Sequence, residues 1–275
     1  MKEPTIGGVT RTVCSLFGID CADESVEGSF PPVVDRASAV GIARCERILL
    51  YAPDAVGQHL CAAFPEVIGP VERRAPISVS LRSVVPPVTP VCFGTMFTGQ
   101  PPSRHGIKTY EKPVLRCETL FDRLLAAGRS AAIVAVHDSS IDRIFRERAI
   151  DYYSETYDSE VTQRALGLIE ADRHDFILVY HQEYDDTLHR TTPRTAEAID
   201  AMRRHVDSFV ELVEATDRFW GGVRSDAWFR AGSRRTHRSR HRPGYARHRH
   251  TGGYGREALV WCLSRSRVSL ANRSG

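Results

Sequence analysis

Short, unbroken apolar runs alternate with longer amphipathic segments between residues 47 and 220, and this alternation most constrains the fold. The runs are RILLYAP at 47–53, SAAIVAV at 130–136 and DFILVYH at 175–181. Strands of a parallel sheet are buried on both faces, so they read as continuous apolar runs joined by helices. The sequence therefore predicts an α/β fold with a largely parallel sheet and helices on both faces.

The segments between these runs have helical spacing. We expect helices in residues 54–64, 118–129, 159–173 and 192–216. Ser159 and Glu160 are start signals for the third helix. Thr192 is the expected cap of the last helix, and Pro193 stands in its first turn.

This pattern ends after Trp220, and the prediction divides the chain into a domain at 1–220 and a basic segment at 221–275. The stretch 233–250 holds seven arginines and four histidines. From residue 221 onward there are 13 arginines, no lysine and two acidic residues, a net charge of +11. Residues 1–220 hold 24 basic and 32 acidic residues, a net charge of −8. Because residues 221–257 show no period of 2 or 3.6, we expect the last ~55 residues to be irregular or disordered.

The cysteines give a further expectation about the compartment. The seven cysteines form no CxxC pair and no even framework, so they are expected to be reduced thiols. The N-terminal segment lacks the apolar stretch of a signal peptide, and no segment is apolar enough for a membrane span. The sequence predicts a soluble, cytoplasmic protein.

Acidic residues follow two of the predicted strands, where open parallel sheets carry their sites. Asp54 comes directly after the first strand, and Asp185, Asp186 and His189 come shortly after the third. Asp185 and His189 are four residues apart, so on a helical turn they share a face and could bind one cation. The alternatives are that Asp54 caps a helix and that Asp185 and His189 lie on a solvated face.

A third candidate lies in TPVCFGTMFTG at 89–99, a hydroxyl-bearing loop that enters a helix ending near Gly99. A threonine at a helix N-terminus has its oxygen among free backbone N–H groups, which favour an anion such as phosphate. Thr89 is thus a candidate nucleophile whose hydroxyl a metal would activate. The alternative is that Thr89 only caps that helix.

Together, YAPDAVG, VPPVTPVCFGTMFTGQPPSRHGI and YDDTLHR resemble the alkaline phosphatase superfamily, in particular its type I phosphodiesterase/nucleotide pyrophosphatase branch. The resemblance covers roughly residues 45–216. Its most specific part is Thr89 followed by Thr98–Gly99 and His105–Gly106–Ile107. It implies an alkaline-phosphatase-like fold and a metal-dependent hydrolase acting on a small phosphate ester.

The resemblance also implies a site with two divalent ions, zinc or else manganese. Asp54 and Thr89 would bind one ion, and Asp185 and His189 the other. Thr89 would attack phosphorus in line and form a phosphothreonine that water then hydrolyses. His105 is expected to be structural. Cys92 departs from the family, which commonly has an asparagine there to contact phosphate, and cysteine is a poor donor.

The family completes its site with later ligands in a DHG and a THG-like motif, and this chain has neither after His189. Permissible codons for residues 230–255, read one base out of register, can encode DHG and then THG. We therefore interpret the basic segment as the product of a frameshift near codon 221. Each metal would then lack at least one ligand, so this chain is expected to be catalytically dead or nearly so.

Other activities of the superfamily, a mutase or a sulfatase, are alternatives, although TPVCFG lacks the Cys-x-Pro-x-Arg setting of sulfatases. The alternative from another class is an acidic α/β body whose arginine-rich arm binds nucleic acid. Tyr245 and Tyr254 would then stack on bases. The chain contains no recognisable nucleic-acid module, so this interpretation ranks second.

Overall fold

The computed structural model describes residues 3–21, 23–224, 226–232 and 259–266. The described strands form one eight-stranded sheet in the order β2-β7-β8-β1-β5-β3-β4, and β6 pairs with β8. The strands are β1 (Arg47–Pro53), β2 (Ile77–Arg82), β3 (Ala131–Val136), β4 (Asp151–Glu155), β5 (Phe176–His181), β6 (Val223–Arg224), β7 (Ala227–Gly232) and β8 (Leu259–Ser266). The predicted α/β class and the largely parallel sheet are confirmed.

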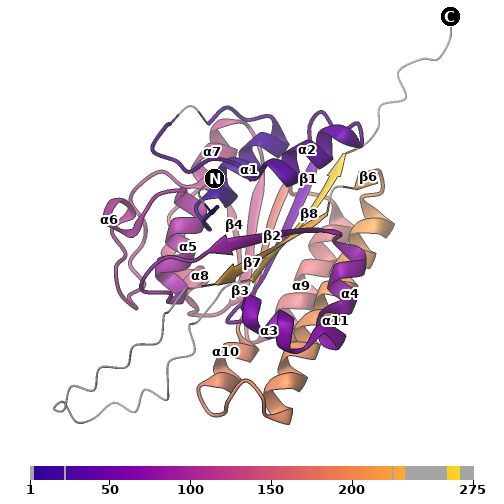
Figure 1. Cartoon of the computed structure of the whole chain (residues 1–275). Helices are drawn as coiled ribbons and strands as arrows, with labels where there is room; N and C mark the ends of the chain where they lie inside the picture. Colours follow the sequence, from indigo (N-terminus) through magenta and orange to yellow (C-terminus); the bar gives the residue numbers. More distant parts are fainter. Residues whose placement is uncertain (1–2, 22, 225, 233–258, 267–275) are drawn as a thin grey trace, which may run out of the picture.

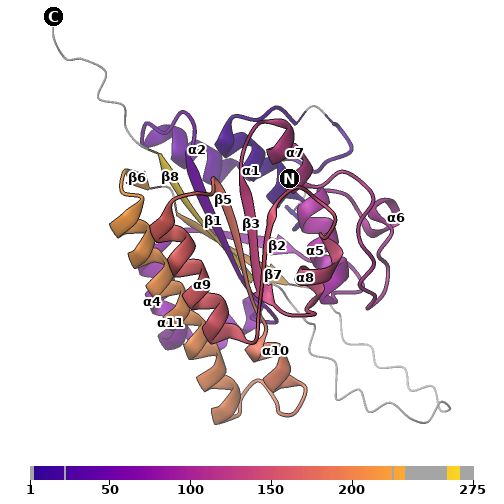
Figure 2. The ribbon, with the colours of Figure 1, turned by 180° about the vertical axis from the view of Figure 1, so that it is seen from behind.

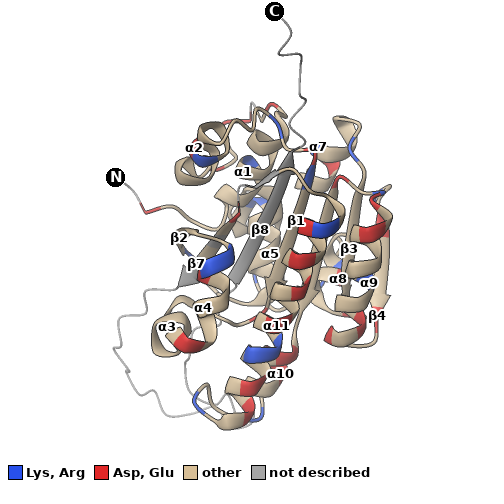
Figure 3. Ribbon diagram, turned by 90° about the vertical axis from the view of Figure 1, so that its right-hand side faces the viewer, with Lys and Arg blue, Asp and Glu red and all other residues tan. Residues whose placement is uncertain are grey.

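Helices pack against both faces of this sheet (Figures 1 and 2). One face carries α1 (Gly8–Phe17), α2 (Pro31–Ala39), α5 (Thr89–Thr98), α7 (Leu120–Ala126) and α8 (Ser140–Ile144). The other carries α3 (Gln58–Ala63), α4 (Pro65–Arg74), α9 (Asp158–Ala171) and α11 (Ala196–Phe219). The short α6 (Pro102–His105) follows α5, and α10 (Glu183–Leu188) follows β5. Charged residues lie along the outward faces of α10 and α11 (Figure 3).

The alternation of side chains along β1 and β5 divides the core into two layers. Ile48 and Leu50 of β1 face the core beneath α1 and α5, whereas Leu49 and Tyr51 face the core beneath α9 and α11. β1 and β5 pair in parallel from Ile48↔Phe176 to Pro53↔His181. Both strands are buried on both faces, which is why each appears in the sequence as an unbroken apolar run.

The helix boundaries differ in detail from the expected ones. The last helix begins at Ala196, and its cap is Thr195, whose hydroxyl accepts a hydrogen bond from the Ala198 N–H at 3.3 Å. Thr192, the expected cap, lies in the preceding turn, where its carbonyl accepts a hydrogen bond from the Thr195 N–H. Proline is favoured in the first turn of a helix and alanine is a good helix former, so Pro193 after Thr192 and Ala196 after Thr195 both allow a helix start.

Three stretches of the segment expected to be irregular are strands: β6, β7 and β8. β8 lies antiparallel between β1 and β7, and β7 pairs in parallel with β2. The apolar run ALVWCL at 258–263 lies beyond the part of the segment that lacks aliphatic residues, which accounts for β8. Residues 233–258 and 267–275 lie outside the described residues, so the expectation for them is untested.

An aromatic group supports α5, the helix that begins at Thr89. The Phe97 ring stacks on Phe121 with centroids 5.3 Å apart, and Phe145 meets it edge-on at 5.2 Å. All three rings are fully buried. Burying aromatic rings in these offset and edge-on geometries stabilises the core beyond area alone.

We predict that Phe97→Ala lowers the free energy of unfolding by about 3–5 kcal/mol, because it removes a buried ring and leaves a cavity. Urea unfolding measures the change. Tyr110→Ala is the matched control, since that ring is 55% exposed, and it should change the free energy by roughly 0.5 kcal/mol or less. Equal losses in the two variants would contradict the assigned core.

Candidate active site

The carboxyl ends of β1 and β5 bring Asp54 into a buried polar cluster. The Asp54 N–H donates to the His181 carbonyl at 2.9 Å, which continues the pairing of the two strands by one residue. The side chain is 5% exposed. Its Oδ1 accepts from the Ala55 N–H at 2.9 Å, and Ala55 has a φ of 61°. A left-handed alanine carries backbone strain, and such strain is concentrated at functional sites.

The other carboxylate oxygen of Asp54 accepts hydrogen bonds from two hydroxyl groups. Thr89 Oγ1 donates to Asp54 Oδ2 at 2.8 Å, and the Tyr180 hydroxyl donates to the same oxygen at 2.7 Å. The sequence predicts a role for Thr89 but not for Tyr180. Tyr180 lies within the apolar run of β5, where the pattern indicates a core residue. The one sequence signal for its contact with Asp54 is its position as the second-to-last residue of β5, near the carboxyl end of the strand.

Thr89 is the first residue of α5 and is 6% exposed. Its hydroxyl makes no capping hydrogen bond and donates to Asp54 instead, so Thr89 does not act as a helix cap. The helix start offers fewer free donors than expected. Pro90 has no N–H, and the N–H groups of Val91 and Cys92 donate to the Val88 carbonyl. The site at Thr89 therefore depends mainly on side chains.

The second predicted pair, Asp185 and His189, comes together on α10 and the residue that ends it. His189 Nε2 lies 3.3 Å from Asp185 Oδ2. Asp185 is buried, and the His189 side chain is 50% exposed. Asp186 points elsewhere, because its Oδ2 accepts from the Tyr157 hydroxyl at 3.0 Å. The predicted shared face thus holds Asp185 and His189 without Asp186.

The two pairs are electrostatically linked. Burial raises the pKa of Asp54 to about 6, and the negative charge of Asp185 adds to that rise. Among the described residues, no Lys or Arg forms an ion pair with Asp54. Two buried carboxylates that repel each other, a hydroxyl and an imidazole form a donor set that fits divalent cations.

The number of ligands is low for such ions. The candidate ligands among the described residues are Asp54 and Thr89 on one side and Asp185 and His189 on the other. A stable zinc site has three or four protein ligands. The stretch from which further ligands are expected, residues 230–255, lies largely outside the described residues.

Asp158 fixes the position of α10 and was not identified from the sequence. Its Oδ1 accepts from the Gln182 N–H at 3.0 Å, and its Oδ2 accepts from the Glu183 N–H at 2.9 Å. These are the first N–H groups of α10, so a carboxylate from α9 caps the helix that carries Asp185. Backbone and imidazole partners outweigh burial and hold the pKa of Asp158 at about 2.

Two other predicted features have structural roles. His105 is buried, and its Nε2 lies 3.0 Å from Thr95 Oγ1. A Cβ on Gly94 would lie 2.9 Å from the His105 ring, so the ring packs directly on α5. Burial raises the pKa of the Cys92 thiol to about 12, and its Sγ lies 3.4 Å from Ser83 Oγ. Cys92 is thus a neutral, buried thiol.

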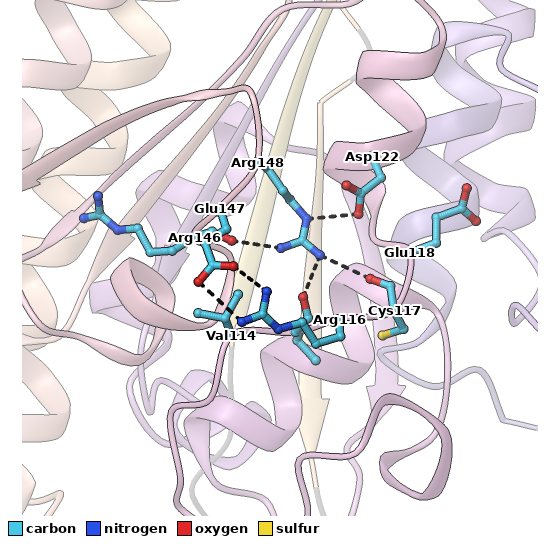
Figure 4. Close-up of a pocket in the computed structure, with 9 residues that line it drawn as sticks. Val114, Arg116, Cys117, Glu118, Asp122, Arg146, Glu147 and Arg148 are labelled. Atoms are coloured by element: carbon cyan, nitrogen blue, oxygen red, sulfur yellow. Dashed lines mark hydrogen bonds and ion pairs between the residues drawn. The ribbon is translucent and has the colours of Figure 1, made fainter.

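A hollow of about 310 Å³ lies apart from these residues, between Val114–Glu118 and Arg146–Arg148 (Figure 4). Arg148 donates to Asp122 at 2.9 Å and to the carbonyls of Leu115 and Cys117, and Arg116 pairs with Glu147. These guanidinium groups are thus paired with carboxylates and carbonyls of the residues that line the hollow.

The sheet order and the cluster at the carboxyl edge of β1 and β5 define an α/β fold with a buried polar site at the centre of its sheet. A family model described as type I phosphodiesterase / nucleotide pyrophosphatase matches residues 74–224, more than half of the chain. The chain belongs to this family of phosphoric ester hydrolases. Among curated proteins, none matches the chain.

Two solved structures share the fold. Phosphonoacetate hydrolase from Sinorhizobium meliloti, in complex with phosphonoacetate, is 17% identical with a TM-score of 0.50, over 66% of this chain and 55% of that one. Murine ectonucleotide pyrophosphatase / phosphodiesterase 5, as an inactive variant with AMP, is 14% identical with a TM-score of 0.54, over 67% and 56%. The chain thus spans little more than half the length of either. In the described part of the present chain, no helix is both long enough and apolar enough to cross a membrane.

The buried His105 generates a prediction about pH. Burial lowers its pKa to about 4, below the ordinary 6.5, so the folded state keeps the ring neutral. Between these values the unfolded chain binds more protons, and the stability contributed by neutral His105 is lost as the pH falls from 6.5 toward 4. We expect the Tm of the parent to fall more steeply over this window than the Tm of His105→Gln.

Thermal unfolding at pH 7.5, 6.0 and 5.0 measures the difference. The exposed His59→Gln variant is the control and should follow the parent. Parallel Tm curves for the parent and His105→Gln would contradict the buried, neutral ring.

Proposed function

We propose that the site is built for hydrolysis of a small phosphate ester with Thr89 as the nucleophile, and that the chain as written has lost most or all of this activity. The observation that supports the role of Thr89 is its hydrogen bond to the buried Asp54 carboxylate. A hydroxyl among buried groups, directed at a carboxylate, is oriented and ready to lose its proton.

The residues of the chain divide the work as follows. Asp54 Oδ2 holds the proton of Thr89 Oγ1 and fixes the direction of attack on phosphorus, and Tyr180 holds the carboxylate in place. The Asp54–Thr89 and Asp185–His189 pairs would each hold a divalent cation, which we propose to be zinc. When bound, the two cations would stabilise the charge on the attacking, leaving and equatorial oxygens.

The proposal of lost activity is supported by the ligand count and by the family match. The four ligands are too few for two stable sites. The match to the family ends at residue 224, four residues after the predicted boundary at Trp220. Residues 221–275 contain 13 arginines and no lysine. We propose that residues 221–275 are out of frame, as the alternative reading with DHG and THG suggests.

A frameshift would also be expected to remove a central strand that the in-frame segment supplies, and β8 bears on this expectation. Loss of the family's own C-terminal strand would leave β1 with an unpaired edge, yet β8 pairs with β1 over Arg47–Tyr51. The loss therefore concerns ligands more than the continuity of the sheet.

We predict that the purified chain hydrolyses bis-p-nitrophenyl phosphate no faster than its own Thr89→Ala variant, with zinc or manganese present. Assay of both proteins side by side at equal concentration measures this. Hydrolysis by the parent at an ordinary enzyme rate would overturn the proposed loss of activity.

Resequencing the gene across the codons for residues 210–275 tests the frameshift. We predict that a one-base correction restores DHG and THG and that the corrected protein hydrolyses the same ester. Its Thr89→Ala variant should then lose roughly 10³-fold or more in kcat, because the nucleophile is gone. Thr98→Ala is the matched control, since that hydroxyl donates to the Gly94 carbonyl within α5 and accepts from the Gln100 N–H at 3.1 Å, and it makes no contact with Asp54. Equal activity in the corrected protein and its Thr89→Ala variant would refute the nucleophile.

A cytoplasmic location remains part of the proposal, and it is supported by the reduced thiols of Cys14, Cys21, Cys92 and Cys117. The alternative, an arginine-rich arm that binds nucleic acid, falls on residues 233–258, outside the described residues. It becomes the leading interpretation if resequencing confirms the codons as given and the chain binds DNA with a steep dependence on salt.

A further inference from the structure

Three titratable side chains meet in a second buried cluster, formed by Asp158 of α9, His181 of β5 and His205 of α11. None of them belongs to the proposed hydrolytic site. They are 5%, 1% and 1% exposed, respectively. One ligand-type atom from each lies within 4.8 Å of the other two.

The distances suit a tetrahedral cation. Asp158 Oδ2 lies 3.1 Å from His205 Nε2 and 3.8 Å from His181 Nδ1. Ligand atoms of a tetrahedral zinc ion are about 3.3 Å apart when its bonds are about 2.0 Å long. The Tyr51 hydroxyl borders the cluster: it lies 2.9 Å from His181 Nδ1 and donates to the His205 carbonyl at 3.1 Å.

The ligands are already oriented by their outer partners. Both carboxylate oxygens of Asp158 accept backbone N–H groups from the start of α10. The far nitrogen of His181, Nε2, lies 3.1 Å from Thr162 Oγ1. Outer hydrogen bonds of this kind fix the direction and tautomer of metal ligands. With these bonds in place, Asp158 Oδ2 stays within 3.1 Å of His205 Nε2 and 3.8 Å of His181 Nδ1.

The charge of the cluster also favours a cation. The cluster holds one carboxylate, from Asp158, and two imidazoles, and all three side chains are buried. Among the described residues, no Lys or Arg pairs with Asp158; its ion-pair neighbours are the two imidazoles. A divalent cation among these groups would neutralise the charge of the buried carboxylate.

We propose that Asp158, His181 and His205 form a binding site for one divalent cation of the zinc type, separate from the phosphate-ester site. The ligand set, one carboxylate and two imidazoles, is typical of zinc. Because the site is buried, the ion enters as the chain folds, and its binding stabilises the joint between α9, β5 and α11.

The test is the metal content of the full-length chain, refolded with zinc and then dialysed, by mass spectrometry. We expect one tightly held zinc ion per chain. His205→Gln should weaken its binding by at least about tenfold. The matched control is His174→Gln, because His174 is also a buried histidine paired with an aspartate, at 2.7 Å from Asp151, outside the cluster.

A second control separates this site from the proposed hydrolytic one. The double variant Asp185→Asn/His189→Gln removes the predicted ligands on α10 and should keep the tightly held ion. Loss of the ion in this double variant but not in His205→Gln would overturn the proposal and assign the metal to the phosphate-ester site. Absence of any bound ion in the parent would also overturn it, leaving a network of hydrogen bonds.

Spectroscopy of the unmodified chain decides the matter if His205→Gln fails to fold. With cobalt in place of zinc, X-ray absorption counts the imidazoles around the ion. We expect two, from His181 and His205, whereas the Asp185–His189 pair can supply only one. A single imidazole, or none, would overturn the proposal.

Discussion

The parallel pairing of β1 with β5 is the interaction on which the rest of the structure depends. The two strands run side by side at the centre of the sheet, and the Asp54 N–H adds one further hydrogen bond beyond their ends. This places the residue after β1 next to the strand that leads into α10. Asp54 and Asp185 are far apart in the sequence, and this pairing is what makes them neighbours.

The charge at that point explains why the surroundings are arranged as they are. Asp54 and Asp185 repel each other, and burial makes the repulsion costly. Hydroxyl groups from Thr89 and Tyr180 reduce the cost at Asp54, and the caps supplied by Asp158 hold α10 in position. The stacked rings of Phe93, Phe97 and Phe121 hold α5, and with it Thr89, in a fixed position beside Asp54.

Much of this arrangement can be predicted from the sequence. β1 was predicted at its observed bounds, and β3 and β5 to within one residue, because a strand buried on both faces leaves an unbroken apolar run. The contact between Asp185 and His189 follows from their spacing of four. The strand at 151–155, DYYSE, escaped prediction because it is partly exposed and mostly polar. Tyr180 and β8 escaped because their roles depend on partners far away in the chain.

β8 also has a consequence for the order in which the fold can be completed. Among the described strands, β2 pairs with β7, β7 with β8, and β8 with β1, so the sheet is continuous only through β8. On the ribosome, β1, β5, β3 and β4 can assemble as soon as α11 has emerged. β2 must wait for residues 259–266 before it joins them through hydrogen bonds. Until then a nascent chain would carry two open strand edges, and it would be a target for chaperones and for premature pairing with other chains.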